Sequence, residues 1–227
     1  MKISERLKEI ASMVTTGNTV ADIGTDHGYV PVYLCKNNIS NHIIAMDINE
    51  GPLKIARQNI KRAELEDKVD IRQSAGFENI KPGEADTAII AGMGGELIVR
   101  ILSEHPEVVS KLKELILSPQ SEINNVREYL SGTCHMIVNE KMILEDGKFY
   151  TIIKTENSGC GTKYSELEYN FGPVLIRKRE PVFMDYLNMR LDKAEKILEN
   201  IKSANSDPDR ITEIEKEITE INKILNG

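Results

Sequence analysis

Length, composition and charge limit the classes of protein to which this chain can belong. Its 227 residues suit one catalytic domain with a small appendage, and its 40% hydrophobic and 29% charged residues are typical of a globular protein. Cys35, Cys134 and Cys160 are widely spaced and form no CxxC pair, so we expect reduced thiols, a cytoplasmic protein and no metal site. The charged N-terminal segment argues against a signal peptide, and without a long apolar run we expect no membrane partner.

The net charge of −7 disfavours a nucleic-acid partner when taken alone, because phosphate binding needs Lys and Arg. The charges are unevenly placed, however. Arg177-Lys178-Arg179 form a local basic run, and Arg190 follows on a helical pattern. This stretch fits either a solvated helix face or a patch that contacts phosphates, and composition alone does not distinguish the two.

The first two thirds of the chain alternate between strand-like and helix-like segments. An amphipathic helical pattern covers residues 7–14, and the first turn after a strand leads to a helix near Pro31. The apolar runs predict strands at 19–23, 41–46, 68–73, 86–91 and 112–117, with helices at 52–62, 94–102 and 122–130. Such alternation predicts an α/β fold with a mostly parallel sheet covered by helices on both faces.

Two features of this predicted sheet direct the search for a site. Segments 135–144 and 148–155 form a predicted terminal hairpin, because Asp146-Gly147 between them is a strong turn signal. Ligands of such sheets bind at the carboxyl ends of the strands, near the point where the strand order reverses. The loops that follow the first four strands are therefore the places in which to look for chemistry.

The chain changes character after a linker at 157–161, and we divide it into domains at 1–158 and 159–227. In the second part, apolar residues recur in steps of three and four, as on the seam of a coiled coil. The two runs are Leu187, Leu191, Ala194, Leu198 and Ile201, and Ile211, Ile214, Ile218, Ile221 and Leu225. Asp207 can cap the second helix and Pro208 can begin it. We predict an antiparallel coiled-coil hairpin, with packing of both helices on the first domain as the alternative.

The most informative chemistry lies in the turn at 22–29, DIGTDHGY. Gly24 and Gly28 permit a tight turn and a close approach of the backbone to a ligand. A dinucleotide-binding loop would hold a pyrophosphate with the spacing GxGxxG, but the spacing here is GxxxG. Asp22 and Asp26 place carboxylates where that pyrophosphate would lie. They attract the ammonium and sulfonium groups of S-adenosylmethionine, so the turn favours this methyl donor as the cofactor.

Further candidates follow the next strands. Asp47 ends the second strand and can accept both ribose hydroxyls of the donor, or alternatively cap the next helix. The loop after the fourth strand, Gly92-Met93-Gly94, offers backbone groups and space for a ligand. Alternatively, its glycines are needed only for the turn into the next helix. The predicted donor-binding residues are Asp22, Gly24, Thr25, Gly28, Asp47, Ile48, Ala75, Gly76, Gly92, Met93 and Gly94.

In combination, these motifs resemble the TrmK family of bacterial tRNA adenine N1-methyltransferases, which modify position 22 of tRNA. The resemblance covers nearly the whole chain. Its motifs are Asp22-x-Gly24-x-Asp26-His27-x-x-x-Pro31, Gly92-Met93-Gly94-Gly95, Ser118-Pro119-Gln120 with Arg127 and Leu130, the segment 145–150, and Phe171-Gly172-Pro173. The departures are small: Gly28 stands where Ala is expected, and Ser121 follows Gln120. The resemblance implies a class I Rossmann-like methyltransferase domain and a C-terminal coiled-coil domain that helps to hold tRNA.

The resemblance also implies a reaction, the transfer of a methyl group from S-adenosylmethionine to N1 of adenine 22, with S-adenosylhomocysteine as the second product. The methylated base is cationic, so a nearby carboxylate stabilises it. Asp26 is the first candidate for a catalytic residue, with His27 orienting it or the base; alternatively, Asp26 holds the ammonium of the donor. We expect a monomer, or a weak dimer, whose tRNA phosphates are contacted by Arg177, Lys178, Arg179 and Arg190.

Two other functions remain open at the level of the sequence. The chain can be a small-molecule methyltransferase whose coiled coil only dimerises it, or a non-catalytic RNA-binding module that retains a donor pocket. Donor affinity without methyl transfer to any tRNA would favour the second of these.

Overall fold

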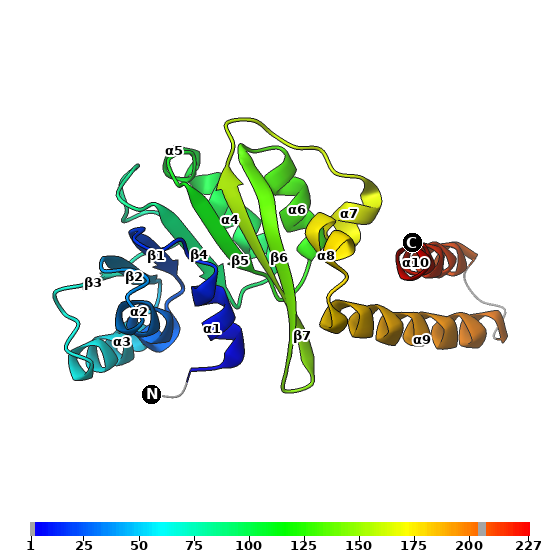
Figure 1. Ribbon diagram of the computed structural model, residues 1–227, viewed down its shortest axis with the longest axis horizontal. Helices are drawn as coiled ribbons and strands as arrows, with labels where there is room; N and C mark the ends of the chain where they lie inside the picture. Colours follow the sequence, from blue (N-terminus) through cyan, green and yellow to red (C-terminus); the bar gives the residue numbers. More distant parts are fainter. Residues whose placement is uncertain (1–2, 204–207) are drawn as a thin grey trace.

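A seven-stranded mixed sheet lies at the centre of the protein, and the computed structural model describes residues 3–203 and 208–227 (Figure 1). The strands are β1 (Val20–Ile23), β2 (Ile43–Asp47), β3 (Val69–Gln73), β4 (Thr87–Ala91), β5 (Glu114–Ser118), β6 (His135–Glu145) and β7 (Lys148–Asn157). Their order is β3-β2-β1-β4-β5-β7-β6. The first five strands are parallel, and β7 is antiparallel to both of its neighbours. The predicted α/β class with a terminal hairpin is confirmed.

Helices cover both faces of the sheet. They are α1 (Glu5–Ser12), α2 (Tyr29–Lys36) and α3 (Glu50–Arg62) on one face, and α4 (Gly95–Glu104), α5 (Pro106–Val109) and α6 (Ile123–Ser131) on the other. Successive side chains of a strand point to opposite faces. Ile89 of β4 therefore packs in the core beneath α1–α3, while its neighbour Ile90 packs in the core beneath α4–α6. None of the described helices is long and apolar enough to cross a membrane.

The order of the strands reverses at β1. From β1 the chain adds β2 and β3 on one side, and then returns to place β4 on the other side of β1. The connections leaving β1 and β4 therefore diverge, and a crevice is expected between their carboxyl ends.

The β6–β7 hairpin forms a wall beside this edge. Its turn residues Asp146 and Gly147 have φ of 49° and 73°, as a two-residue hairpin turn requires. Leu117 of β5 pairs with Ile153, so the register carries residues 148–151 beyond the carboxyl end of β5. The Glu145 carboxylate at the tip accepts a hydrogen bond from the Glu5 backbone N–H at 2.7 Å, which ties α1 to the hairpin.

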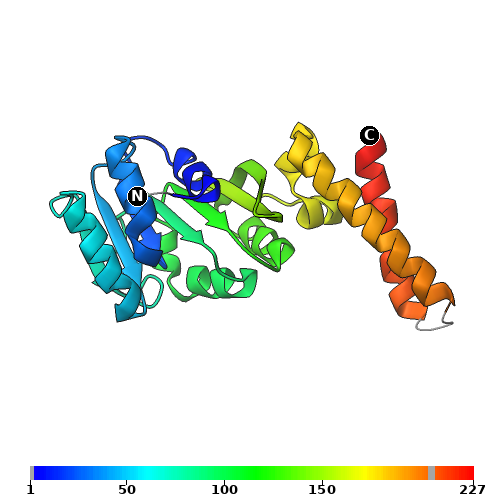
Figure 2. The same ribbon diagram turned by 90° about the horizontal axis from the view of Figure 1, so that it is seen from below.

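The C-terminal part is helical and projects from one end of the sheet (Figure 2). It consists of α7 (Glu166–Phe171), α8 (Pro173–Lys178), α9 (Pro181–Ser203) and α10 (Pro208–Asn226). In this pair of long helices, Leu187 and Ala194 of α9 and Ile214 and Ile221 of α10 are buried, and all four belong to the predicted seams. Pro208 begins α10 as predicted, whereas the predicted cap Asp207 lies outside the described residues.

A buried ion pair joins the helical part to the sheet. Arg127 of α6 and Glu140 of β6 are 2% and 0% exposed, with 2.8 Å between Nε and Oε1. The Arg127 guanidinium donates to the Tyr169 carbonyl at the end of α7, and the Glu140 carboxylate accepts from the Val174 N–H at the start of α8. Between them Gly172 has φ of 95°, and a Cβ there would lie 2.6 Å from the Glu140 carboxylate. The segment Phe171-Gly172-Pro173 thus has a structural role at this joint.

Candidate active site

The turn after β1 is shaped by glycine and by backbone hydrogen bonds. The N–H groups of Gly24 and Thr25 both donate to the Met46 carbonyl of β2, at 2.7 and 2.8 Å. A Cβ on Gly24, whose φ is 75°, would lie 2.3 Å from the methyl carbon of Met93. Gly28 has φ of 69° and packs on Ala56, so the alanine that the resemblance suggested there does not suit this backbone.

A cavity of roughly 380 Å³ opens above this turn, at the point where the strand order reverses. It is lined by Arg6 and Leu7 of α1, by Asp22, Ile23, Gly24 and Asp26 in and after β1, by Tyr29 and Val30 of α2, by Asp47 of β2, by Ala91, Gly92 and Met93 at the end of β4, and by Gln120 after β5. The structure therefore brings six of the predicted donor-binding and catalytic residues together, namely Asp22, Gly24, Asp26, Asp47, Gly92 and Met93.

The floor of the cavity is acidic. Asp22 is buried, and burial raises the pKa of its carboxyl to about 6; the Thr25 hydroxyl opposes this shift and the nearby Asp47 charge adds to it. Asp47 accepts a hydrogen bond from the Asn49 N–H at 2.8 Å, which fixes its carboxylate at the end of β2. A cationic ligand is favoured here, because it would stabilise the ionised form of Asp22.

Asp26 and His27 occupy different positions relative to the cavity. The Asp26 side chain is 75% exposed and lines the cavity. His27 does not line it: its Nδ1 lies against the Asp26 carboxylate, and its ring stacks on Tyr29 with the centroids 5.6 Å apart. Asn59 of α3 donates to the His27 carbonyl at 2.9 Å and so holds this turn, in which His27 has φ of 61°. His27 thus lies beside Asp26 but outside the cavity wall.

The remaining predicted donor-binding residues lie outside the cavity wall. They are Thr25, Gly28, Ile48, Ala75, Gly76 and Gly94. Ile48 follows β2 and exposes 61% of its surface, which leaves an apolar side chain next to Asp47 in the chain. Gly76 has φ of 57° and packs on Ile101, so its absence of a side chain is required by the fold.

Arg6 and Gln120 line the cavity although neither was predicted as a site residue. Nη1 of Arg6 is buried and has no hydrogen-bond partner among the described residues, and the same holds for the Ser118 hydroxyl. The guanidinium lies over the Tyr150 ring at 4.8 Å. No local pattern in the sequence identifies Arg6, because only the packing of α1 on the sheet and on the hairpin brings it to the carboxyl edge. Gln120 stood in a recognised motif but carried no assigned role.

The predicted tRNA-binding residues do not form one free basic patch. Arg179 donates to the carbonyls of Ile224 and Leu225 and so caps the end of α10. Arg190 pairs with Glu217 of α10. Arg177 and Lys178 are exposed, and Lys178 donates to the Asn139 side chain at 2.7 Å. Arg179 and Arg190 therefore stabilise the packing of the helices.

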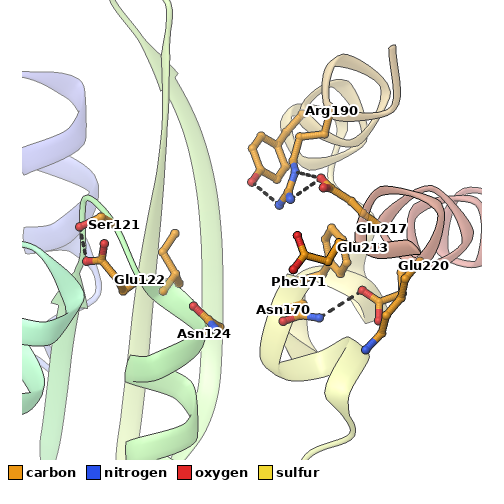
Figure 3. A pocket seen from close by; sticks show the side chains of 12 residues that line it. Ser121, Glu122, Asn124, Asn170, Phe171, Arg190, Glu213, Glu217 and Glu220 are labelled. Carbon is orange, nitrogen blue, oxygen red and sulfur yellow. Dashed lines mark hydrogen bonds and ion pairs between the residues drawn. The ribbon is translucent and has the colours of Figure 1, made fainter. Parts of the chain in front are cut away.

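A groove of roughly 460 Å³ separates the start of α6 from α9 and α10 (Figure 3). On one side Arg190 is bound to Glu217 and to the Tyr186 hydroxyl, and Asn170 is bound to Glu220. Glu122 and Glu213 also line the groove. Four glutamates line the groove against two basic residues, Arg190 and Lys216, and both of these are already paired, so the groove is a poor site for phosphate.

Comparison with known proteins extends these observations. Residues 3–153 match the family described as a methyltransferase domain. The chain is 33% identical over 208 residues to the tRNA (adenine(22)-N(1))-methyltransferase of Bacillus subtilis, over 90% of this chain and 87% of that protein. The crystal structure of the B. subtilis m1A22 tRNA methyltransferase TrmK superposes with a TM-score of 0.87 at 30% identity and 99% coverage of both chains. TrmK of M. capricolum, solved with S-adenosylhomocysteine, gives 0.84 at 27% identity, over 100% of this chain and 99% of that one.

The strand order, the family match and the cavity beside the turn after β1 define a Rossmann-like methyltransferase. The likeness to the B. subtilis enzyme extends over most of both chains, including the helical part that a methyltransferase domain does not require. The protein belongs to the tRNA (adenine(22)-N(1))-methyltransferase family, TrmK.

Proposed function

We propose that the protein transfers the methyl group of S-adenosylmethionine to N1 of the adenine at position 22 of tRNA. The observation that carries this proposal is the extent of the likeness to the B. subtilis tRNA (adenine(22)-N(1))-methyltransferase. It continues beyond the sheet into α7–α10, with 99% of both chains superposed. A chain that shared only the donor chemistry would share only the sheet and its helices.

The cavity suits the methyl donor in charge and in space. Asp47 is placed to accept the ribose hydroxyls, and Asp22 to attract the ammonium group of the methionine moiety. Gly24 leaves room for the close approach of a ligand. Asp22, Asp26 and Asp47 together disfavour a pyrophosphate-bearing cofactor. When bound, S-adenosylmethionine supplies an electrophilic methyl group.

Asp26 is our candidate for stabilising the acceptor base. N1 of adenine attacks through an in-plane lone pair, so the base must be unpaired when it enters the site. Methylation makes the base cationic, and the exposed Asp26 carboxylate at the cavity is placed to balance this charge. His27 lies against Asp26 and serves as its positioning residue.

The helical part is proposed to hold tRNA, with Arg177 and Lys178 contacting phosphates. Both side chains are exposed on the last turn of α8, next to the joint with the sheet. Because the apolar faces of α9 and α10 pack against each other within one chain, the protein needs no second copy to bury them, and we propose a monomer.

The test is incubation of the protein with methyl-labelled S-adenosylmethionine and unmodified bacterial tRNA, followed by nucleoside analysis. We expect label in 1-methyladenosine, and no label in a matched tRNA whose adenine 22 is replaced by guanine. Label that persists after this replacement would assign the activity to another position. Donor binding without labelling of any tRNA would favour a small-molecule acceptor or a non-catalytic RNA-binding module.

A further inference from the structure

Cys134 and Cys160 are far apart in the sequence, but the structure brings their backbones together. Ser158 follows β7 and donates its backbone N–H to the Cys134 carbonyl at 2.8 Å, which continues the β6–β7 pairing beyond His135 and Asn157. The Ser158 hydroxyl contacts this carbonyl at 3.2 Å and the Cys160 carbonyl at 2.8 Å. Two carbonyl oxygens that contact the same hydroxyl lie within about 6 Å of each other.

The chain after β7 turns back along the loop that precedes β6. Gly159 has φ of 76° and lies in the bend. Two residues later, a Cβ on Gly161 would lie 2.8 Å from the Ser131 carbonyl in that loop. Cys160 therefore lies between two residues that contact the segment of Cys134. A disulfide joins Cα atoms about 4–7 Å apart, and the spacing of these two backbone segments is of that order.

The two cysteines are exposed and lie away from the donor cavity. The third cysteine of the chain, Cys35, is buried. Because β7 is antiparallel to both β5 and β6, β6 runs parallel to the first five strands and begins at their amino ends. The donor cavity lies at the carboxyl ends of those strands, and neither exposed cysteine lines it. Small solutes can thus reach both thiols without entering the cavity.

We propose that Cys134 and Cys160 form a dithiol site that closes to a disulfide by exchange with a low-molecular-weight disulfide such as oxidised glutathione. The thiolate of one cysteine attacks the S–S bond of the oxidant, which leaves a mixed disulfide and releases one glutathione thiolate. The thiolate of the other cysteine then attacks the cysteine sulfur of the mixed disulfide and releases the second. Two cysteines are oxidised, and one oxidant disulfide is reduced to two thiols, which take up the two protons. Under reducing conditions the reverse exchange returns the thiols that the sequence predicts.

The closed site fastens the linker between β7 and α7 to the start of β6. Farther along this linker, the Tyr164 hydroxyl already accepts a hydrogen bond from the Ile137 N–H of β6 at 3.1 Å. The disulfide would hold the near end of the linker as this contact holds its far end. The ring that it closes includes the whole β6–β7 hairpin, and a cross-link around a long loop stabilises the fold by restricting the unfolded chain.

The test incubates the full-length protein with oxidised glutathione at pH 8.0 and determines the intact mass under non-reducing conditions. We expect a single chain that has lost two hydrogen atoms and carries no glutathione. Its melting temperature should rise by roughly 5–10 °C relative to the reduced protein. The affinity for S-adenosylhomocysteine should change by less than about twofold, because the cavity lies at the opposite edge of the sheet.

Cys134→Ser and Cys160→Ser are the matched variants. Each should retain one glutathione as a mixed disulfide and show no rise in melting temperature, because the thiol that would displace the glutathione is absent. Cys35→Ala should close as the unmodified protein does. An unreacted protein, two glutathione groups on one chain, or a disulfide-linked dimer would overturn the proposal. A closed disulfide without a rise in melting temperature would overturn its role as a fastener. Neither methyl donor nor tRNA takes part in the exchange, so its result is independent of the proposed function.

Discussion

Asp22 links the stability of the protein to the occupancy of its cavity. Burial raises the pKa of this carboxyl from 3.8 to about 6. Because the folded state holds the proton more tightly than the unfolded state, the free energy of unfolding falls as the pH rises through this window. The shift in the pKa of Asp22 between the unfolded and the folded state corresponds to roughly 3 kcal/mol in the free energy of unfolding. We therefore expect Asp22→Asn to raise the free energy of unfolding of the ligand-free protein by up to about 3 kcal/mol above pH 6, and far less near pH 4, in urea titrations.

The same carboxyl should make donor binding depend on pH. If the ammonium of the donor requires ionised Asp22, the affinity for S-adenosylhomocysteine falls about tenfold between pH 7.5 and pH 5, since only about a tenth of the carboxyl is ionised one pH unit below its pKa. Asp22→Asn should bind more weakly at pH 7.5 and show a flat profile. Asp185→Asn, an exposed change on α9, is the control. A wild-type profile that is flat over this range would argue against the contact.

Asp26 supports a separate prediction about the rate. Replacing Asp26 by Asn removes the charge at nearly constant shape, so kcat for tRNA methylation should fall about tenfold or more, equivalent to about 1.4 kcal/mol of transition-state stabilisation. Single-turnover measurements with saturating donor check this, and the donor affinity is measured in parallel. A kcat within about threefold of the unmodified protein would remove Asp26 from catalysis. Weaker donor binding at unchanged kcat would assign it to the ammonium instead.

At the residue scale, the sequence predicted those site residues that lie close together in the chain. Asp22, Gly24 and Asp26 share one turn, and Asp47 ends the next strand, so the strand pattern sufficed to place them in one cavity. Arg6 reaches the same cavity because α1 packs against the sheet and the hairpin. No spacing of residues in the sequence indicates this packing. Arg179 shows the converse: in the sequence it belongs to a basic run, but in the structure it satisfies the free carbonyls at the end of α10.

At the scale of elements, every predicted strand is present, and its ends lie within about two residues of the predicted ones. The strands were predictable because apolar runs and a strong hairpin turn mark them in the sequence. The short helices α5, α7 and α8 were not predicted. They have four to six residues each, too few for a helical period to emerge. Their positions depend on tertiary partners instead, above all on the Arg127–Glu140 pair that holds α7 and α8.

This buried pair should dominate the stability of the joint. Glu140→Gln leaves the Arg127 charge without its partner in a site where both side chains are at most 2% exposed, so we expect a loss of about 3–5 kcal/mol in the free energy of unfolding. Urea titration measures it. The combined Arg127→Met/Glu140→Met variant should lose less than the sum of the two single changes, because no charge is then left unpaired.

The Lys202–Glu215 pair between α9 and α10 is the matched comparison. Both of its side chains are about half exposed, and Lys202→Gln should change the free energy of unfolding by less than about 1 kcal/mol. Similar losses for Glu140→Gln and Lys202→Gln would show that burial of the Arg127–Glu140 pair does not govern its contribution.

At the scale of the whole molecule, the sheet and the helical part share a hydrophobic core. Met142 of β6 and Phe149 of β7 pack with Phe171, Phe183 and the end of α10. The same hairpin that holds α1 beside the donor cavity therefore carries the helices, and packing fixes the orientation of α7–α10 relative to the sheet. The sequence showed two segments of different periodicity but not this shared core, because it is built from residues far apart in the chain.

A chain of net charge −7 must bind tRNA through a local surface, and the joint offers Arg177 and Lys178 beside the helices. Neutralising both to Gln should weaken tRNA binding and make the slope of log K against log salt less negative by up to about 2, one for each lost phosphate contact. Donor affinity should not change. The control replaces Lys61 and Arg62, an adjacent exposed pair on α3, and this helix lies at the end of the sheet away from the helical part (Figure 1). An equal loss from both pairs would indicate a general charge effect, whereas an unchanged slope in the Arg177/Lys178 variant would place the tRNA on another face.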